Sequence, residues 1–345
     1  MKACPNCFAS GTWISNVSLQ DASPAVCDFC GKFAPHTWLT TAWTETLTRL
    51  FSIYEVAESP DVGNELCDQI QSDWHIFSFA DSLQIERFLS SAFTDPHPLL
   101  VAGVRVRLRF GSIGPNADHI VSWSKFSEEI RLRNRYFPQT ELDGGLLRDA
   151  LLGSVESITK GTPLYRARVL TSEVVPETSE MGAPPASKAS PGRANPVGIP
   201  YLYLSYEERT CIYETRVANH TRVAIGTFAT DRELKVLNLA DIEVPDFFST
   251  EDPVASISFY RYLQALGNEL KRPVRSSDQV IDYIPTQYLC ELAKSSGLDG
   301  VLYSSSLDHP DGRNVVLFDV DAAQCHLVRI AQVTSLTAEW EMVSD

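Results

Sequence analysis

The sequence predicts an α+β fold in three parts, and three observations support this. Two Cys-x2-Cys pairs lie within residues 1–36, apolar residues recur at helical spacing over residues 37–160, and strand and helix patterns alternate over residues 161–345. The chain has 345 residues, which is more than one ordinary hydrophobic core holds. We expect a zinc ribbon over 1–36, a mostly helical domain over 37–160 and an α+β domain over 161–345.

The composition is that of a folded protein, because 16 Phe, 12 Tyr and 6 Trp are too many for a disordered chain. The net charge of −15 argues against nucleic acid as a partner. The longest apolar stretch, Leu99–Phe110, is interrupted by three arginines and is too short to span a membrane. The first residues carry no apolar signal region. We expect a soluble, cytoplasmic protein that does not bind membranes.

The four N-terminal cysteines have the spacing of a zinc site. Cys4 and Cys7 form one pair, Cys27 and Cys30 the other, and each pair supplies two thiolates to one tetrahedral ion. A site closed by four thiolates leaves no position for a substrate, so we expect structural Zn²⁺. The alternatives are two disulfides, which a cytosolic location disfavours, or four ordinary thiols, although chance seldom gives two well-spaced pairs. We expect the intervening chain to form a short β-hairpin, with strands around Thr12–Ile14 and Val17–Leu19.

Two basic clusters stand out in the helical part. Val101–Phe110 alternates strictly, which predicts a half-buried strand whose other face carries Arg105, Arg107 and Arg109. This face is either solvated at the edge of a sheet or a binding stripe. A second cluster, Arg131 to Arg135, is predicted on a helix. With the ribbon, the first cluster leaves open a nucleic-acid sensor, against which the net charge argues.

The C-terminal part supplies the strands of the predicted α+β fold. Six strands are expected, at Pro163–Val169, Ile199–Leu204, Val223–Phe228, Lys235–Leu239, Gly300–Ser304 and Asn314–Val320. Two helices are expected, at about Tyr206–Asn219 and Gln287–Ser296. The segment Thr171–Gly192 is rich in proline and resembles a linker in composition, but it leads directly into the most informative stretch. We interpret it as an active-site loop, because long loops inside a domain are often functional.

Local signals place polar side chains at the ends of these elements. Ser205 and Glu208 match a capping box, so a helix is expected to begin at the end of the preceding strand. Glu214 then lies about two turns into that helix, where it is either functional or a structural partner for an arginine. Thr286 is expected to cap the next helix, and the following strand ends in Ser304–Ser306, where hydroxyls often line a cleft.

Several motifs in order resemble the RES family, which is named for its Arg, Glu and Ser residues. The resemblance covers about residues 160–330, and the family's long form adds an N-terminal zinc ribbon and a helical HEPN/RES N-terminal region. It rests on Tyr165-Arg166, Gly182–Pro185, Gly192-Arg193-x-Asn195-Pro196-x-Gly198-Ile199-x-x-Leu202-Tyr203, Glu214, Tyr303-x-Ser305 and the strand Asn314–Phe318. It implies a fold similar to ADP-ribosyltransferases, with NAD as substrate and cleavage at the nicotinamide–ribose bond.

Matched by motif, the family's Arg falls on Arg193, its Glu on Glu214 and the Tyr between them on Tyr203. Its Ser falls on Ser305, and Arg166 matches the earlier Arg of the first strand. The run Ser304-Ser305-Ser306 leaves the Ser assignment open by one position, so Ser304 is also a candidate for NAD binding.

These residue types suit the implied chemistry. A pyrophosphate needs guanidinium groups, for which Arg193 and Arg166 are the candidates. Breaking the N-glycosidic bond passes through an oxocarbenium-like state, which the carboxylate of Glu214 would stabilise. Tyr203 would stack on or hydrogen-bond the ribose, and Ser305 would donate to the amide or ribose. No Gly-x-Gly-x-x-Gly motif follows a strand, so NAD would be consumed and not cycled.

The resemblance leaves the acceptor open between water (glycohydrolase), phosphate (phosphorylase) and a protein side chain (ADP-ribosyltransferase). The expected role is that of a bacterial toxin or defence effector, with an antitoxin or regulatory protein as partner. A homo-oligomer is left open. The alternative from another class is a non-catalytic binding module built on the same fold.

Overall fold

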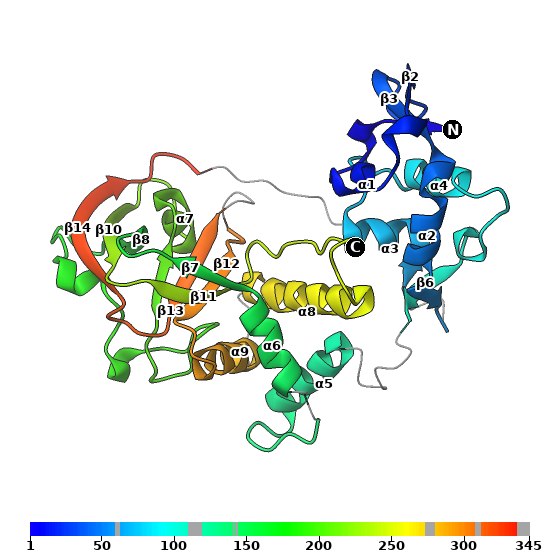
Figure 1. Cartoon of the computed structure of the whole chain (residues 1–345). Helices are drawn as coiled ribbons and strands as arrows, with labels where there is room; N and C mark the ends of the chain where they lie inside the picture. The colour runs from blue at the N-terminus through cyan, green and yellow to red at the C-terminus, as the bar shows by residue number, and fades with distance from the viewer. Residues whose placement is uncertain are drawn as a thin grey trace, which may run out of the picture. The chain divides into compact units, whose positions relative to one another are not determined.

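The computed structural model describes residues 1–58, 63–109, 119–140, 142, 144–272, 280–307 and 312–336. They form two compact units, each assembled from two stretches of chain: Met1–His119 with Glu243–Arg261, and Ile120–Ile242 with Tyr262–Asp345. Both contain helices and sheets, which confirms the predicted α+β class (Figure 1). Within the described ranges, no helix has the length and apolarity needed to cross a membrane.

The first unit contains two small antiparallel sheets surrounded by short helices. One sheet has the order β1-β3-β2 and the other β4-β6-β5. Their strands are β1 (Lys2–Ala3), β2 (Ser23–Val26), β3 (Phe33–Leu39), β4 (Tyr54–Val56), β5 (Asn64–Glu65) and β6 (Arg105–Leu108). The helices are α1 (Thr12–Ser15), α2 (Thr44–Phe51), α3 (Leu66–Trp74) and α4 (Ser82–Ser91), together with the first part of α8 (Pro253–Lys271).

The predicted hairpin between the cysteine pairs is wrong. Thr12–Ser15 forms the one-turn helix α1, and Leu19–Asp21 forms a 3₁₀ turn capped by the Ser18 side chain. The residues that looked like alternating strand positions are instead held by packing, since Trp13 is buried and stacks on Phe8. Tertiary contacts of the aromatic rings therefore override the local strand preference.

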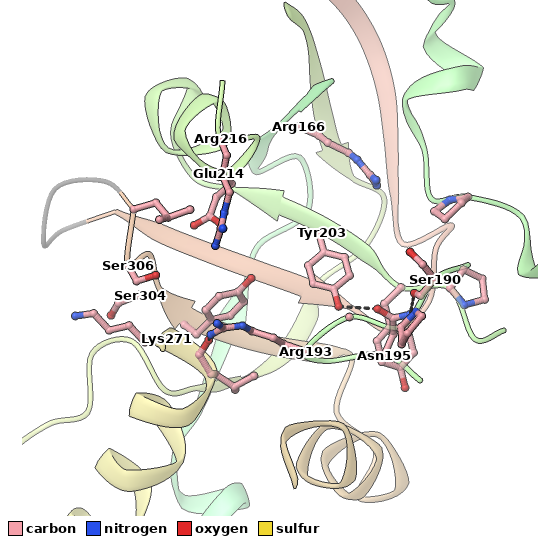
Figure 2. A pocket seen from close by; sticks show the side chains of 18 residues that line it. Arg166, Ser190, Arg193, Asn195, Tyr203, Glu214, Arg216, Lys271, Ser304 and Ser306 are labelled. Carbon is pink, nitrogen blue, oxygen red and sulfur yellow. Dashed lines mark hydrogen bonds between the residues drawn. The ribbon is translucent and has the colours of Figure 1, made fainter. Parts of the chain in front are cut away.

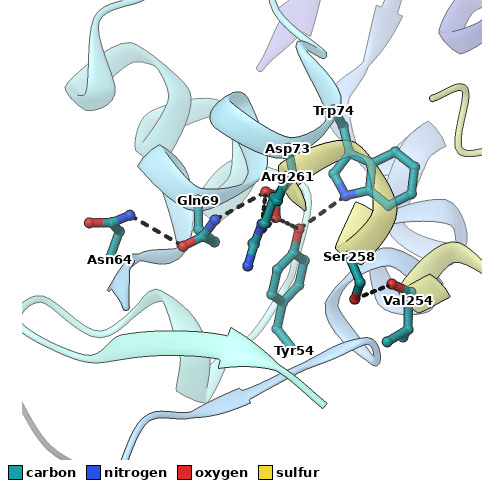
Figure 3. Close-up of polar contacts among 8 residues, drawn as sticks. All are labelled: Tyr54, Asn64, Gln69, Asp73, Trp74, Val254, Ser258 and Arg261. Atoms are coloured by element: carbon teal, nitrogen blue, oxygen red, sulfur yellow. Dashed lines mark hydrogen bonds and ion pairs between the residues drawn. The ribbon is translucent and has the colours of Figure 1, made fainter. Parts of the chain in front are cut away.

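A buried ion pair ties the segment Glu243–Arg261 into the first unit. Asp73 is 1% exposed, and its two carboxylate oxygens accept hydrogen bonds from Arg261 at 2.7 and 2.5 Å (Figure 3). The Tyr54 hydroxyl donates to the same carboxylate at 2.6 Å, and Gln69 donates at 3.1 Å. These four hydrogen bonds from three residues satisfy the buried charge, which is the condition under which such a pair is tolerated in a core.

The second unit is organised around an eight-stranded sheet of order β14-β10-β8-β9-β13-β12-β11-β7. Neighbouring strands are antiparallel except β11 and β12. The strands are β7 (Val155–Ile158), β8 (Pro163–Val169), β9 (Leu202–Ser205), β10 (Arg222–Thr230), β11 (Leu234–Asn238), β12 (Gly300–Ser304), β13 (Arg313–Leu317) and β14 (Ala323–Gln332). The helices are α5 (His119–Leu132), α6 (Gly144–Gly153), α7 (Glu208–Glu214), α9 (Ile284–Ser295) and the end of α8.

Alternation along the strands divides the core of this unit into two layers. Leu204, Leu302 and Val315 belong to the larger cluster on one face. Val223 and Ile225 belong to a smaller cluster that includes Cys211 of α7. The helix α7 packs against β8, β9, β10 and β13, which are consecutive strands of the sheet (Figure 1).

All six predicted strands are present, two of them with the predicted bounds (β8 and β12). The helix expected over Tyr206–Asn219 is shorter, because α7 spans Glu208–Glu214. The capping box is wrong: Glu207 is the N-cap, and the Ser205 hydroxyl donates to Asn314 Oδ1 at 2.6 Å. The cap predicted at Thr286 is also wrong, since α9 begins at Ile284.

Candidate active site

A pocket of about 580 Å³ lies in the second unit, where β8 and β9 pair only at Tyr165 and Ser205. Its volume falls within the range of small-molecule sites. The lining residues are Arg166, Pro184, Ser190, Pro191, Gly192, Arg193, Asn195, Pro200, Tyr201, Tyr203, Glu214, Arg216, Leu270, Lys271, Tyr303, Ser304, Ser306 and Leu307 (Figure 2). Every site residue predicted for NAD lines it except Ser305, which contacts the lining residue Glu214.

The carboxylate of Glu214 is oriented by two buried donors. Ser305 Oγ and Asn314 Nδ2 both donate to Oε1 of Glu214, each at 2.7 Å. Strand register explains this, because Ser205, Asn314 and Tyr303 lie side by side across β9, β13 and β12. Ser305 and Asn314 are buried whereas Glu214 is exposed to the pocket. Within the described chain no hydrogen bond reaches Oε2, so one oxygen is fixed and the other is available to a ligand.

The ring of Tyr203 lines the pocket, but its hydroxyl is engaged by the chain. It donates to Asn195 Oδ1 at 2.7 Å and accepts from the backbone N–H of Ala194 at 3.2 Å. Burial raises the pKa of Tyr203 and keeps the phenol neutral. The amide of Asn195 in turn donates to the carbonyls of Ser190, Pro196 and Ile199. Tyr203 thus shapes the pocket wall, and the apolar ring is the part it offers to a ligand.

The glycine before Arg193 is required by this close packing. A Cβ at Gly192 would lie 2.6 Å from Asn195 Oδ1 and 2.7 Å from the Tyr203 hydroxyl oxygen. We expect Gly192→Ala to break the Tyr203–Asn195 bond and to reduce the free energy of unfolding by about 1–3 kcal/mol. Urea unfolding measures this. Gly182→Ala is the matched control, because its Cβ would meet only Ser179 O at 3.9 Å. Equal stability of the two variants would contradict the proposed packing.

Arg193 is positioned by the ends of two helices. Its Nη1 donates to Leu270 O, near the C-terminus of α8, at 2.8 Å. Its own carbonyl accepts from the Thr286 hydroxyl of α9 at 2.6 Å, and Gln287 Nε2 donates to the carbonyls of Gly192 and Asn195. Figure 2 shows Arg193 and Lys271 reaching the pocket from the side opposite Glu214 and Arg216.

Among the pocket residues for which the sequence predicted no role are Arg216, Lys271 and Tyr303. Arg216 follows Glu214 by two positions and has a left-handed backbone, with φ of 52°. Lys271 ends α8, a helix that the sequence analysis missed although Ile257, Leu263, Leu266 and Leu270 recur at helical spacing. Burial raises the pKa of Tyr303, and the charge of Glu214 adds to this effect. The helical repeat was a usable signal for Lys271 and the Tyr303-x-Ser305 motif for Tyr303, whereas nothing local marked Arg216.

A family model described as the RES domain matches residues 163–343, just over half of the chain. The chain belongs to the RES-domain family. No curated protein matches the sequence. Among solved structures, a chain of the M. tuberculosis MbcT-MbcA toxin-antitoxin complex is similar at 14% identity and a TM-score of 0.32, over 56% of this chain and 93% of that chain.

Outside the RES domain, the four N-terminal cysteines meet as their spacing predicts. The Sγ atoms of Cys4, Cys7, Cys27 and Cys30 all lie within 4.8 Å of one another, with Cys7–Cys27 at 3.3 Å and Cys4–Cys7 at 3.9 Å. Four sulfurs around one Zn²⁺ at ~2.3 Å are roughly 3.8 Å apart, so the donor set fits a tetrahedral ion. A possible metal site is thus present, and zinc remains the prediction.

The basic clusters are largely paired inside the protein. Arg107 forms ion pairs with Glu55 and Glu58, both at 2.9 Å, and Arg105 donates to Gly63 O. Arg131 pairs with Asp282 at 3.3 Å. Phe110, the predicted end of the first basic strand, lies outside the described residues. The interpretation as a solvated face of a sheet accounts for Arg105 and Arg107 without a nucleic-acid ligand.

Proposed function

We propose that this RES-domain protein is an NAD-consuming enzyme that cleaves the nicotinamide–ribose bond. The observation that carries the proposal is the Glu214 carboxylate, held through Oε1 and open at Oε2, in a pocket that three arginines also line. Together with the family membership, this supports a site in which a carboxylate and candidate phosphate-binding groups share one small-molecule pocket. We further propose that it acts as a toxin or defence effector controlled by a partner protein.

In this proposal the substrate's pyrophosphate is bound by Arg193 and Arg166. Oε2 of Glu214 holds the hydroxyls of the nicotinamide ribose. As the glycosidic C–N bond breaks, its electron pair goes to the nicotinamide nitrogen, which leaves as a neutral ring. Positive charge then develops on the ribose, and the carboxylate of Glu214 stabilises it.

The remaining predicted residues position these groups. Ser305 fixes Oε1 of Glu214, which favours Ser305 over its neighbours as the family serine; Ser304 lines the pocket and bonds to Ala240 O. The face of Tyr203 packs against the ribose or nicotinamide. The acceptor that captures the ribose carbon is water in a glycohydrolase, phosphate in a phosphorylase, or a protein side chain in an ADP-ribosyltransferase.

Mass analysis of the products tests this function. The purified protein is incubated with NAD in the presence and absence of phosphate. Free nicotinamide with ADP-ribose indicates hydrolysis, ADP-ribose phosphate indicates phosphorolysis, and a mass increase of the protein or an added target indicates transfer. Intact NAD after long incubation with folded protein would contradict the proposal and favour a binding module.

Arg193→Ala is expected to raise KM for NAD about tenfold or more, because a hydrogen bond to a charged group contributes roughly 1.5–3 kcal/mol. Steady-state kinetics and the melting temperature are measured on the same preparation. Since Arg193 also bonds to Leu270 O, a fall of a few degrees in Tm is expected. Arg193→Lys keeps the charge and should recover part of the affinity. An unchanged KM with a large loss of Tm would show that Arg193 is only structural.

A further inference from the structure

Two arginines project from one face of the strand β8. Arg166 and Arg168 are separated by one residue, so their side chains leave the strand on the same side. Their cross-strand neighbours on β10 are Gly226 and Ala224, which offer no polar side chain. On the other side, β9 pairs with β8 only at Tyr165. Neither neighbouring strand supplies a counter-charge for the two guanidinium groups.

Both guanidinium groups are incompletely satisfied although they are partly buried. Arg166 Nη1 and Arg168 Nε are buried atoms without a hydrogen-bond partner. In the described ranges of the chain, neither arginine takes part in an ion pair. Burial, and then the nearby charge of Arg168, lowers the pKa of Arg166 to about 10. Two like charges held this way are unfavourable unless an anion joins them.

Arg168 is also linked to the wall of the pocket. Its Nη2 donates to the carbonyl of Gly182 at 2.7 Å. Pro184, two residues after Gly182, lines the pocket. Arg166 lines the same pocket (Figure 2). Arg168 does not line the pocket, so its effect on a ligand must pass through Arg166 and the segment Gly182–Pro184.

We propose that Arg168 is a positioning residue that, with Arg166, forms a paired-guanidinium subsite for the phosphate groups of the substrate. This rests on the proposed function for the identity of the substrate, but the binding of phosphate groups does not depend on turnover. Arg166 contacts the phosphate oxygens. Arg168 adds positive charge beside Arg166 and holds the Gly182–Pro184 segment that borders the subsite.

The test compares substrates that differ in their phosphates. NAD carries two, nicotinamide mononucleotide carries one and nicotinamide riboside carries none. Arg168→Gln is expected to raise KM about tenfold for NAD and nicotinamide mononucleotide, and to leave KM for nicotinamide riboside within twofold of wild type. Arg168→Met, which fills a similar volume without charge, is measured in parallel because either variant alone could fail to fold. Equal changes for all three substrates would show a structural role and overturn the proposal.

Arg222→Gln is the matched control, since it removes one positive charge from the neighbouring strand β10, where Arg222 pairs with Glu173. Its KM values should stay at wild type. Calorimetric titration with ADP separates the subsite from the reaction, because ADP carries the diphosphate and no nicotinamide. A tenfold weaker Kd for ADP in Arg168→Gln supports the subsite even if NAD is not consumed. An equal Kd in wild type and Arg168→Gln overturns it even if NAD is consumed.

Discussion

Glu214→Gln is expected to lower the rate of nicotinamide release by roughly 100- to 1000-fold, as removal of other preorganised electrostatic groups does. The variant keeps an oxygen at the position of Oε1, which can still accept from Ser305 and Asn314. It loses the negative charge that opposes the developing charge on the ribose. The side chain of Glu214 is exposed to the pocket, so folding should be little affected. NAD binding should fall far less than the rate, since Arg193 and Arg166 remain.

Glu208→Gln serves as the matched control, because Glu208 begins the same helix and pairs with Arg329 away from the pocket. Its turnover should equal that of wild type. The measurement is nicotinamide release together with the melting temperature on one preparation. Near-normal turnover in folded Glu214→Gln would remove Glu214 from the mechanism and with it most of the case for catalysis. Lost stability with activity retained in the folded fraction would show a structural carboxylate.

Much of the RES-domain fold was predictable because its strands carry local signals. The predicted bounds of β8 and β12 match those of the structure to the residue. β14 was missed because His326 and Arg329 interrupt its apolar pattern at a sheet edge. β7 was missed because it is short and only half-buried. The prediction of a hairpin between the cysteine pairs was wrong for a different reason, because aromatic packing around Trp13 determines the conformation of that segment.

The residues of the candidate site likewise divide into those that local sequence signals reveal and those that only the folded structure reveals. Arg193, Tyr203 and Glu214 lie within 22 residues of sequence, and an ordered motif could identify them. Asn314 contacts Glu214 only because β13 lies beside β9, a pairing between strands about 110 residues apart. Lys271 reaches the pocket from a helix that was not predicted. The proximity of Arg168 to Arg166 indicates a phosphate subsite only once it is known that atoms of both guanidinium groups are buried without a hydrogen-bond partner. The sequence thus revealed the residues of the motif, including Ser305, which orients Glu214, but it gave no role to Asn314, Lys271 or Arg168.

Removal of metal is expected to unfold the first unit and to leave the second folded. If the four cysteines bind Zn²⁺, the binding free energy, on the order of 10 kcal/mol, becomes folding free energy of this small unit. The loops that carry the ligands also anchor its core: Phe8, next to Cys7, packs on Trp43, and Phe29, next to Cys30, packs on Phe88. Releasing the metal frees both loops and exposes this aromatic cluster.

Tryptophan fluorescence reports on this directly, because four of the six tryptophans, Trp13, Trp38, Trp43 and Trp74, belong to the first unit. A chelator should shift their emission to the red, while the transition of the second unit in calorimetry stays unchanged.

Cys30→Ser should reproduce the effect of the chelator, and Cys325→Ser, which changes a thiol outside the cluster, should not. Protons compete with the metal for the thiolates, so acid should release the metal at lower chelator concentration. Less than half an equivalent of zinc in protein made with ample zinc, or a chelator that leaves the fluorescence unchanged, would contradict the metal site, and the cluster would then be four packed thiols.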